Sequence, residues 1–230
     1  MRLSPRLQAI ADYVPKGSVV ADIGTDHGYI PVYLVSNKIS SKIIATDINI
    51  GPLRNASSYI NKKNYRENIE TRLGNGLNCL LPNEVDTIVI AGMGGFLIAE
   101  ILENSTEITK TTKYFILQPM VASEELRRFL YNKKFKIIDE KLAKEGNKLY
   151  EVMLVAHGED KVEKDIYFEI GKKLIENKDK YLEEFINNKI AKTRKVLSTL
   201  RNSETKEVKL RYEYLKNKYN DYKGVLEEIC

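Results

Sequence analysis

The stretch SVVADIGTDHGYIP, from Ser18 to Pro31, places a short apolar run directly before a glycine-rich turn and a helix start. We predict a strand at Ser18–Ile23 and a helix at Pro31–Asn37. Glycines at a strand-to-helix turn let the backbone pass close to a ligand. The stretch therefore predicts an α/β fold with a nucleotide-like cofactor at its first strand. The simpler alternative is a tight turn that binds nothing.

The identity of that cofactor depends on one carboxylate. The glycines Gly24 and Gly28 are spaced GxxxG, and Asp26 stands where the middle glycine of a dinucleotide-binding GxGxxG would be. A carboxylate there repels a pyrophosphate but pairs with the ammonium group of a methionine moiety. The turn thus favours S-adenosylmethionine (SAM) over a nicotinamide dinucleotide.

Apolar runs and helical stretches alternate through the first 132 residues. Strands are predicted at Ile43–Asp47, Ile69–Leu73, Val85–Ala91 and Tyr114–Gln118, and helices at Pro52–Lys63, Phe96–Glu103 and Ser123–Asn132, besides a first helix that starts at Pro5. This βαβα order implies a parallel sheet. Two runs separated only by a polar turn, Phe135–Lys144 and Leu149–Ala156, are predicted to pair antiparallel. A mostly parallel, Rossmann-like sheet with an antiparallel terminal pair is the layout of class I methyltransferases.

The composition changes after Gly158. Residues 159–230 contain no proline and are rich in lysine, glutamate and large apolar residues at helical spacing. We predict a SAM-binding domain over 1–158 and a C-terminal helical hairpin domain, similar to a coiled coil, over 159–230. Its two long helices are expected to turn near Arg201 to Glu204.

The ends of the second and third strands carry further candidate ligands. Asp47 is placed to accept hydrogen bonds from ribose hydroxyls, and Asn49 lies within reach of the same sugar. Asn49 fits a helix N-cap at least as well. Asn75 and Gly76 follow the third strand, where an amide can recognise the exocyclic amine of adenine, although a simple glycine-rich turn explains them equally well.

The fourth and fifth strands end where α/β enzymes bind their substrates. The candidate acceptor-site residues there are Gly92, Met93, Gly94 and Gly95 after the fourth strand, and Gln118, Pro119 and Met120 after the fifth. Close helix packing and a turn are the alternative explanations. Tyr29 and Met93 are candidates for sandwiching a flat base, and core packing is the alternative for Tyr29.

The bulk composition excludes several classes of protein. A formal charge of +5 permits RNA binding without requiring it. Only two cysteines, Cys79 and Cys230, and two histidines, His27 and His157, are present, so neither a metal site nor a disulfide framework is expected. The longest apolar stretch, Thr87 to Ala99, is too short to span a bilayer, and no secretory signal is recognisable, so a cytoplasmic protein without membrane contact is expected.

Five stretches of the chain together resemble the bacterial tRNA (adenine-22, N1)-methyltransferase family. They are LSPRL from Leu3, VPKGSVVADIGTDHGYIPVYL from Val14, RLGNGL from Arg72, EVDTIVIAGMGG from Glu84 and LQPM from Leu117. The resemblance extends over the whole chain. It implies methyl transfer from SAM to N1 of adenine 22, with tRNA as the partner.

The resemblance also implies a distribution of cofactor contacts. Asp22, Gly24, Asp26, His27 and Gly28 would surround the methionine part, Asp47 and Asn49 the ribose, and Asn75 and Gly76 the adenine. The family usually has aspartate at the position of Asn75. Neutral adenine N1 carries a free lone pair, so the implied reaction is an in-line displacement that requires no general base.

Basic residues on the tail are candidates for holding the RNA body: Lys189, Lys192, Arg194, Lys195 and Arg201, with Arg2 and Arg6 near the amino terminus. A solvated helix face is the alternative. We expect a monomer, with a dimer through the tail as the alternative. The competing functions are SAM-dependent methylation of another RNA or of a small molecule, and a non-catalytic RNA-binding protein with a vestigial fold.

Overall fold

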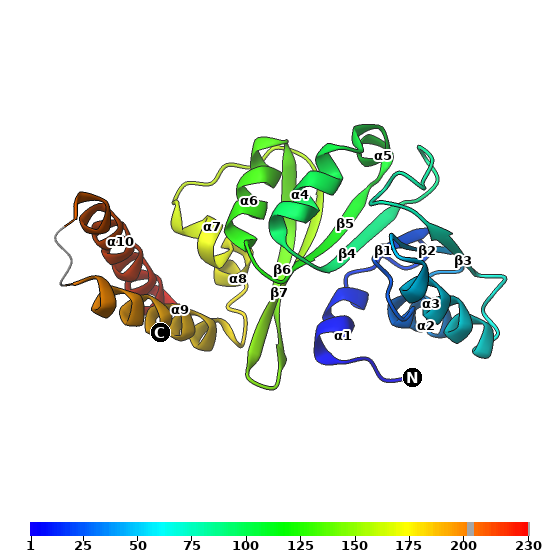
Figure 1. The fold of residues 1–230 in the computed structure, drawn as a ribbon, viewed down its shortest axis with the longest axis horizontal. Coiled ribbons are helices and arrows are strands. Elements are labelled where there is room, and N and C mark those ends of the chain that lie inside the picture. Colours follow the sequence, from blue (N-terminus) through cyan, green and yellow to red (C-terminus); the bar gives the residue numbers. More distant parts are fainter. Residues whose placement is uncertain (202–204, 230) are drawn as a thin grey trace. The chain divides into compact units, whose positions relative to one another are not determined.

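The structure is a computed structural model that describes residues 1–201 and 205–229. The chain divides into two compact units, Met1–Lys161 and Val162–Cys230, each with its own internal packing (Figure 1). The first unit contains the sheet and the candidate site. The second unit is helical. No helix within the described residues is long and apolar enough to cross a membrane.

A single mixed sheet organises the first unit, with strand order β3-β2-β1-β4-β5-β7-β6. Its strands are β1 (Val20–Ile23), β2 (Ile43–Asp47), β3 (Ile69–Leu73), β4 (Thr87–Met93), β5 (Tyr114–Pro119), β6 (Phe135–Glu145) and β7 (Lys148–His157). The first five are parallel, whereas β7 lies antiparallel between β5 and β6. The predicted parallel sheet with an antiparallel terminal pair is therefore confirmed.

The six helices α1 to α6 cover the two faces of this sheet (Figure 1). They are α1 (Pro5–Ala11), α2 (Tyr29–Ser36), α3 (Ile50–Lys62), α4 (Gly95–Glu103), α5 (Thr106–Thr111) and α6 (Ser123–Asn132). One apolar core joins α4, α5 and α6 to the sheet, and a second joins α1, α2 and α3 to its other face. Because both faces are covered, β1 and β2 are buried at every position, and their sequences are mainly apolar, with polar residues only at Asp22, Thr46 and Asp47.

Several element boundaries differ from the sequence prediction. The first strand begins at Val20 because the Ser18 hydroxyl and amide both hydrogen-bond to the Pro15 carbonyl in a turn. Helices α2 and α3 each begin two residues before the predicted proline, since proline is tolerated within the first turn of a helix. Strand β4 continues through a bulge at Gly92, and helix α5 was not predicted at all.

A buried ion-pair network fixes α6 to the antiparallel pair. Arg127 on α6 is 0% exposed, and its guanidinium lies 2.8 Å from Glu140 Oε1 on β6. The same group also binds Glu151 on β7. Buried charges are tolerated only when they are paired, so these three residues specify how the helix sits on the sheet.

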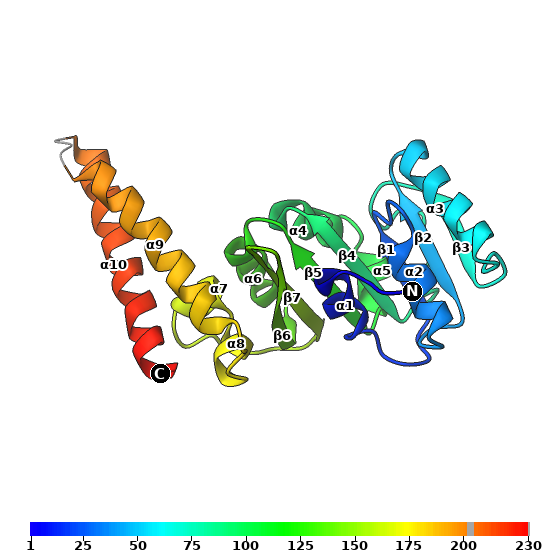
Figure 2. The ribbon, with the colours of Figure 1, turned by 90° about the horizontal axis from the view of Figure 1, so that it is seen from below.

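The second unit differs from the predicted pair of long helices. Two short helices, α7 (Ile166–Ile170) and α8 (Lys172–Glu176), precede the long helices α9 (Leu182–Leu200) and α10 (Lys206–Ile229). Gly171, with a φ of +92°, separates α7 from α8. Helices α9 and α10 pack side by side as a hairpin (Figure 2). The turn predicted at 201–204 falls mainly on residues 202–204, which lie outside the described residues.

Candidate functional site

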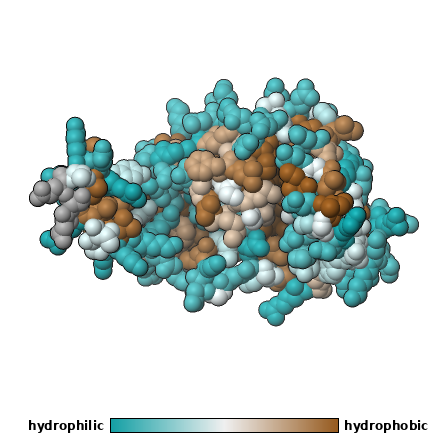
Figure 3. Space-filling model, viewed as in Figure 1, coloured by the Kyte–Doolittle hydropathy of each residue, from teal (hydrophilic) through white to brown (hydrophobic). Residues whose placement is uncertain are grey.

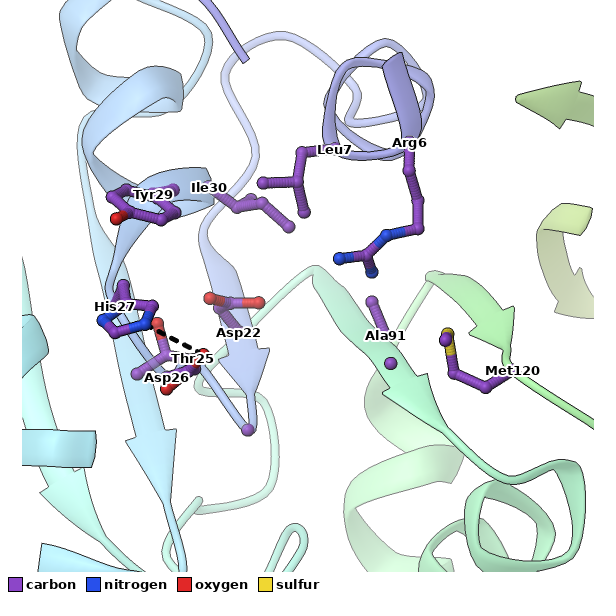
Figure 4. Close-up of a pocket in the computed structure, with 12 residues that line it drawn as sticks. Arg6, Leu7, Asp22, Thr25, Asp26, His27, Tyr29, Ile30, Ala91 and Met120 are labelled. Atoms are coloured by element: carbon purple, nitrogen blue, oxygen red, sulfur yellow. Dashed lines mark ion pairs between the residues drawn. The ribbon is translucent and has the colours of Figure 1, made fainter. Parts of the chain in front are cut away.

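A cavity of about 430 Å³ opens at the carboxyl ends of β1 and β4, beneath helix α1 (Figure 4). Its lining comes from α1, the β1–α2 turn and the ends of β4 and β5. The lining residues are Arg6, Leu7, Asp22, Gly24, Thr25, Asp26, His27, Tyr29, Ile30, Ala91, Gly92 and Met120. The cavity thus lies where open α/β sheets bind ligands.

The β1–α2 turn contains three residues with left-handed backbone conformation. Gly24, Asp26 and Gly28 have φ values of +73°, +52° and +70°, a region where side chains are disfavoured. A Cβ atom on Gly24 would lie 2.5 Å from the Cε atom of Met93. Met93 therefore packs against the turn, and of the pair expected to sandwich a base only Tyr29 lines the cavity.

Asp22 is the most unusual group in the cavity. Its side chain is at the end of β1, and the residue is only 4% exposed. Burial raises its pKa to about 6, partly opposed by the Thr25 hydroxyl, while the nearby charge of Asp47 raises it further. Within the described residues, no cation forms an ion pair with this carboxylate. A buried, charged and unpaired group at a cavity wall indicates a cationic ligand.

Asp47 stabilises the turn from the neighbouring strand. One carboxylate oxygen accepts the Asn49 amide at 2.9 Å, and the other accepts the Asp26 amide at 3.4 Å. Each oxygen retains acceptor capacity for a further donor. Asn49 occupies the N-cap position of α3. The predicted N-cap position of Asn49 is therefore confirmed, although its side chain forms no capping hydrogen bond.

Asn75 and Gly76 lie farther along the same edge of the sheet. They border a separate hollow of about 70 Å³ together with residues of α4, including Leu97 and Ile101. Backbone hydrogen bonds connect the strand ends, from Gly24 to the Thr46 carbonyl and from Gly74 to the Asp47 carbonyl. The turns after β1, β2 and β3 consequently form one continuous edge.

The residues after β4 and β5 have different environments. Gly92 lines the cavity, whereas a Cβ atom on Gly95 would lie 2.1 Å from the Ala122 carbonyl oxygen, so Gly95 serves close packing. Gln118 and Pro119 are buried, and of these two segments only Gly92 and Met120 line the cavity. Gly94 lies outside the lining, and a Cβ atom on it would lie 3.6 Å from Val121 Cγ2.

Exposed apolar side chains adjoin the cavity at Met120. Val121 and Phe96 are each 67% exposed, and Met120 and Leu97 are 45% and 47% exposed. The Gly95 amide hydrogen-bonds to the Val121 carbonyl, which holds these two segments together. Figure 3 shows apolar surface over the part of the unit that contains α4. Such a surface suits stacking against a nucleobase.

Sequence reasoning missed several lining residues. The sequence predicts only phosphate contacts for Arg6, and Leu7, Thr25, Ile30 and Ala91 are not among the predicted site residues although they line the cavity. The LSPRL stretch was the feature of the sequence that could have indicated the residues on α1. It includes the start of this helix, which covers the cavity (Figure 4). As for metals, no cluster of three or more histidine, cysteine, aspartate or glutamate side chains suited to a metal occurs among the described residues.

Comparison with known proteins places this geometry in a family. A methyltransferase domain model matches residues 3–153. The tRNA (adenine(22)-N(1))-methyltransferase of Bacillus subtilis (strain 168) is 41% identical over 159 residues, covering 69% of this chain and 67% of the relative. The chain belongs to the tRNA (adenine(22)-N(1))-methyltransferase family.

Solved structures of this methyltransferase family match over nearly the full chain. The crystal structure of the B. subtilis M1A22 tRNA methyltransferase TrmK superposes with a TM-score of 0.90 at 32% identity, covering 98% of this chain and 99% of that one. A Streptococcus pneumoniae putative tRNA (m1A22) methyltransferase in complex with SAM gives 0.88 at 29% identity, covering 98% and 100%. The likeness includes the helical tail.

Proposed function

We propose that this chain uses SAM to methylate N1 of adenine 22 in tRNA. The observation that carries the proposal is the buried, unpaired carboxylate of Asp22 at the wall of the cavity. Membership of the family supports the cofactor and the substrate.

The described residues fit the parts of SAM in order along the sheet edge. Asp22 and Asp26 are suited to the ammonium group, with Gly24 and Gly28 leaving room for the methionine backbone. Asp47 at the end of β2 and Asn49 at the N-cap of α3 follow, where they suit the ribose hydroxyls. Asn75 and Gly76 come next, after β3, and suit the adenine. His27 lies at the same turn, with its ring 5.3 Å from that of Tyr29.

The chemistry requires positioning more than proton transfer. Bound SAM supplies a methyl group on a sulfonium, and neutral adenine N1 attacks with its own lone pair. The Watson–Crick edge of the base must be free, so the target adenine has to leave its stack. Tyr29 and Met120 are both exposed in the cavity lining, where they can pack against the faces of that base. No general base is assigned to this chain.

The substrate is tested with two tRNA transcripts that differ only at position 22. The chain should transfer labelled methyl from SAM to the transcript with adenine 22, and mapping should place the label on N1 of that nucleotide. A transcript with guanine 22 should remain unlabelled, because it lacks an unprotonated N1. Equal labelling of both transcripts would favour another RNA position, and labelling of neither would favour a small-molecule acceptor or a non-catalytic role.

We further propose that the second unit binds the body of the RNA, while the SAM-binding domain over residues 1–158 carries out methyl transfer. Of the basic candidates, Lys189 pairs with Glu169 and Arg194 bonds to the Tyr219 hydroxyl, so both have structural partners. Lys192, Lys195 and Arg201 are exposed. These three are the better candidates for phosphate contacts.

Reversal of Lys192, Lys195 and Arg201 to glutamate should weaken tRNA binding and lower the slope of log affinity against log salt by about 1 per lost contact. A filter-binding titration at several salt concentrations measures both. Reversal of Lys16, Lys38 and Lys62, which are exposed on the first unit, changes the net charge equally and serves as the control. Equal loss in both triple variants would show a non-specific charge effect.

A further inference from the structure

Arg6 reaches into the cavity from above. It lies on α1, and Figure 4 shows its side chain descending toward Ala91 on β4. The guanidinium Nη1 donates to Gln118 Oε1 at 2.9 Å, and its Cζ lies 5.6 Å from the centre of the Tyr150 ring. The Arg6 backbone amide also donates to Glu145 Oε1 at 3.0 Å. Backbone and side chain are therefore both anchored.

Gln118 determines where the guanidinium points. It is 0% exposed, and its amide nitrogen donates to the Pro119 carbonyl at 2.8 Å. That bond leaves the Gln118 carbonyl oxygen facing the cavity side, where it accepts from both Arg6 and the Gly92 amide. A guanidinium has five N–H donors, and Gln118 uses one of them.

The positive charge of Arg6 has no ion-pair partner in residues 1–201 and 205–229, and the cavity lies directly below it. The cavity thus presents carboxylates from the β1 side, Asp22 and Asp26, and a cation from the α1 side. An α-amino acid carries an ammonium and a carboxylate on a single carbon. The two charged sides of this cavity match those two groups.

We propose that Arg6 binds the carboxylate of the methionine part of SAM, with Gln118 as the residue that positions it. This inference rests on the proposed function and adds a determinant of cofactor specificity. A planar guanidinium recognises a carboxylate through paired, charge-assisted hydrogen bonds. The site should therefore discriminate between SAM and decarboxylated SAM, which keeps the sulfonium, the amine and the nucleoside but lacks the carboxylate.

The test compares these two ligands by calorimetry in the wild-type protein and in Arg6→Met. The wild type should bind SAM more tightly than decarboxylated SAM. Arg6→Met should lose about 10- to 100-fold in SAM affinity, the range of a charge-assisted hydrogen bond, while its affinity for decarboxylated SAM stays within about 3-fold. Retained binding of decarboxylated SAM also shows that the variant is folded.

Three further variants sharpen the interpretation. Arg6→Lys keeps the positive charge but lacks the paired N–H donors of the guanidinium. It should therefore recover part of the discrimination between SAM and decarboxylated SAM. Gln118→Met should also reduce the discrimination between SAM and decarboxylated SAM, but by less than Arg6→Met does. The reason is that the guanidinium is still present and has only lost the residue that positions it. Arg66→Met, which changes an exposed arginine outside the cavity lining, should leave both affinities unchanged.

Two results would overturn the assignment. Unchanged SAM affinity in Arg6→Met, together with a raised KM for tRNA, would show that Arg6 binds an RNA phosphate. Equal loss for both ligands would show that Arg6 only supports the fold of α1. Absence of SAM binding in the wild type would instead contradict the proposed function itself, so the two failures are distinguishable.

Discussion

Asp22→Asn is expected to lower SAM affinity by at least about 100-fold while making the ligand-free protein more stable. The carboxylate is 4% exposed and unpaired in the described structure, so the folded state carries the cost of burying its charge. With ligand, the same charge attracts the ammonium group of SAM, and a buried pairing of this kind contributes about 2–5 kcal/mol. One substitution should therefore move affinity and stability in opposite directions.

The pH dependence of stability follows from the direction of the pKa shift. Because burial raises the pKa of Asp22 to about 6, its contribution to the free energy of unfolding decreases as pH rises from about 4 to about 6. The stability gain of Asp22→Asn should accordingly grow between about pH 4 and about pH 6 and then stay at about 1–3 kcal/mol up to pH 7. Denaturant titrations of both proteins at several pH values measure this gain. A variant less stable than the wild type at pH 7 would contradict the prediction.

The SAM affinity of the wild type should weaken as pH falls through about 6, because protonation removes the negative charge that the ligand needs. Asp22→Asn should lack this dependence. Asp26→Asn is the matched control, since the Asp26 side chain is 65% exposed and its charge is already solvated. It should lose less affinity and gain no stability. A SAM affinity that does not change between pH 5 and pH 8 would exclude Asp22 as the ammonium partner.

Arg127→Ala is expected to destabilise the first unit by about 3–5 kcal/mol. The substitution leaves Glu140, which is 3% exposed, and Glu151 on the adjacent strand without their buried cation. Two carboxylates would then face each other in the core. Urea unfolding of the wild type and the variant at pH 7 measures the loss. The midpoint should recover partly at low pH, where both glutamates are neutral.

A neighbouring arginine on the same helix provides the control. Arg128 pairs with Glu124 one turn earlier, at 2.9 Å, in a partly exposed position. This pair is only partly buried, and helical pairs of this spacing contribute about 0.3–0.5 kcal/mol, so Arg128→Ala should change stability little. Replacing Arg127, Glu140 and Glu151 together by methionine and leucines should restore much of the stability. If Arg127→Ala and Arg128→Ala behave alike, the buried network does not fix α6.

The local chemistry of the β1–α2 turn could be predicted from the sequence, because each prediction depended only on residues that are neighbours in the chain. Gly24 and Gly28 predicted a turn whose backbone can approach a ligand closely, and both glycines have left-handed φ values, with Gly24 in the lining of the cavity. The order of apolar runs predicted a parallel sheet, since continuous burial on both faces leaves that pattern in the sequence. Helix α6 was predicted with the observed bounds because Ser123–Asn132 has a clear helical period.

Contacts between distant segments were beyond sequence reasoning. Arg6 and Gln118 are 112 residues apart, and nothing in either local pattern shows that α1 lies over the end of β5. Gln118 and Pro119 were therefore assigned to the acceptor site, whereas packing buries both. Likewise, the glycines after β4 look alike in sequence, but Gly92 lines the cavity and Gly95 packs against the Ala122 backbone.

The sequence by itself determined the strand order along the chain, the glycine turn with its carboxylates and the family, because these depend on backbone conformation and residue type within short windows. Only the tertiary structure decided which side chains face the cavity, which charges lie buried and unpaired, and that a cation from α1 opposes Asp22. Burial and pairing are properties of three-dimensional packing, so the electrostatics of the site emerge only when the segments are assembled.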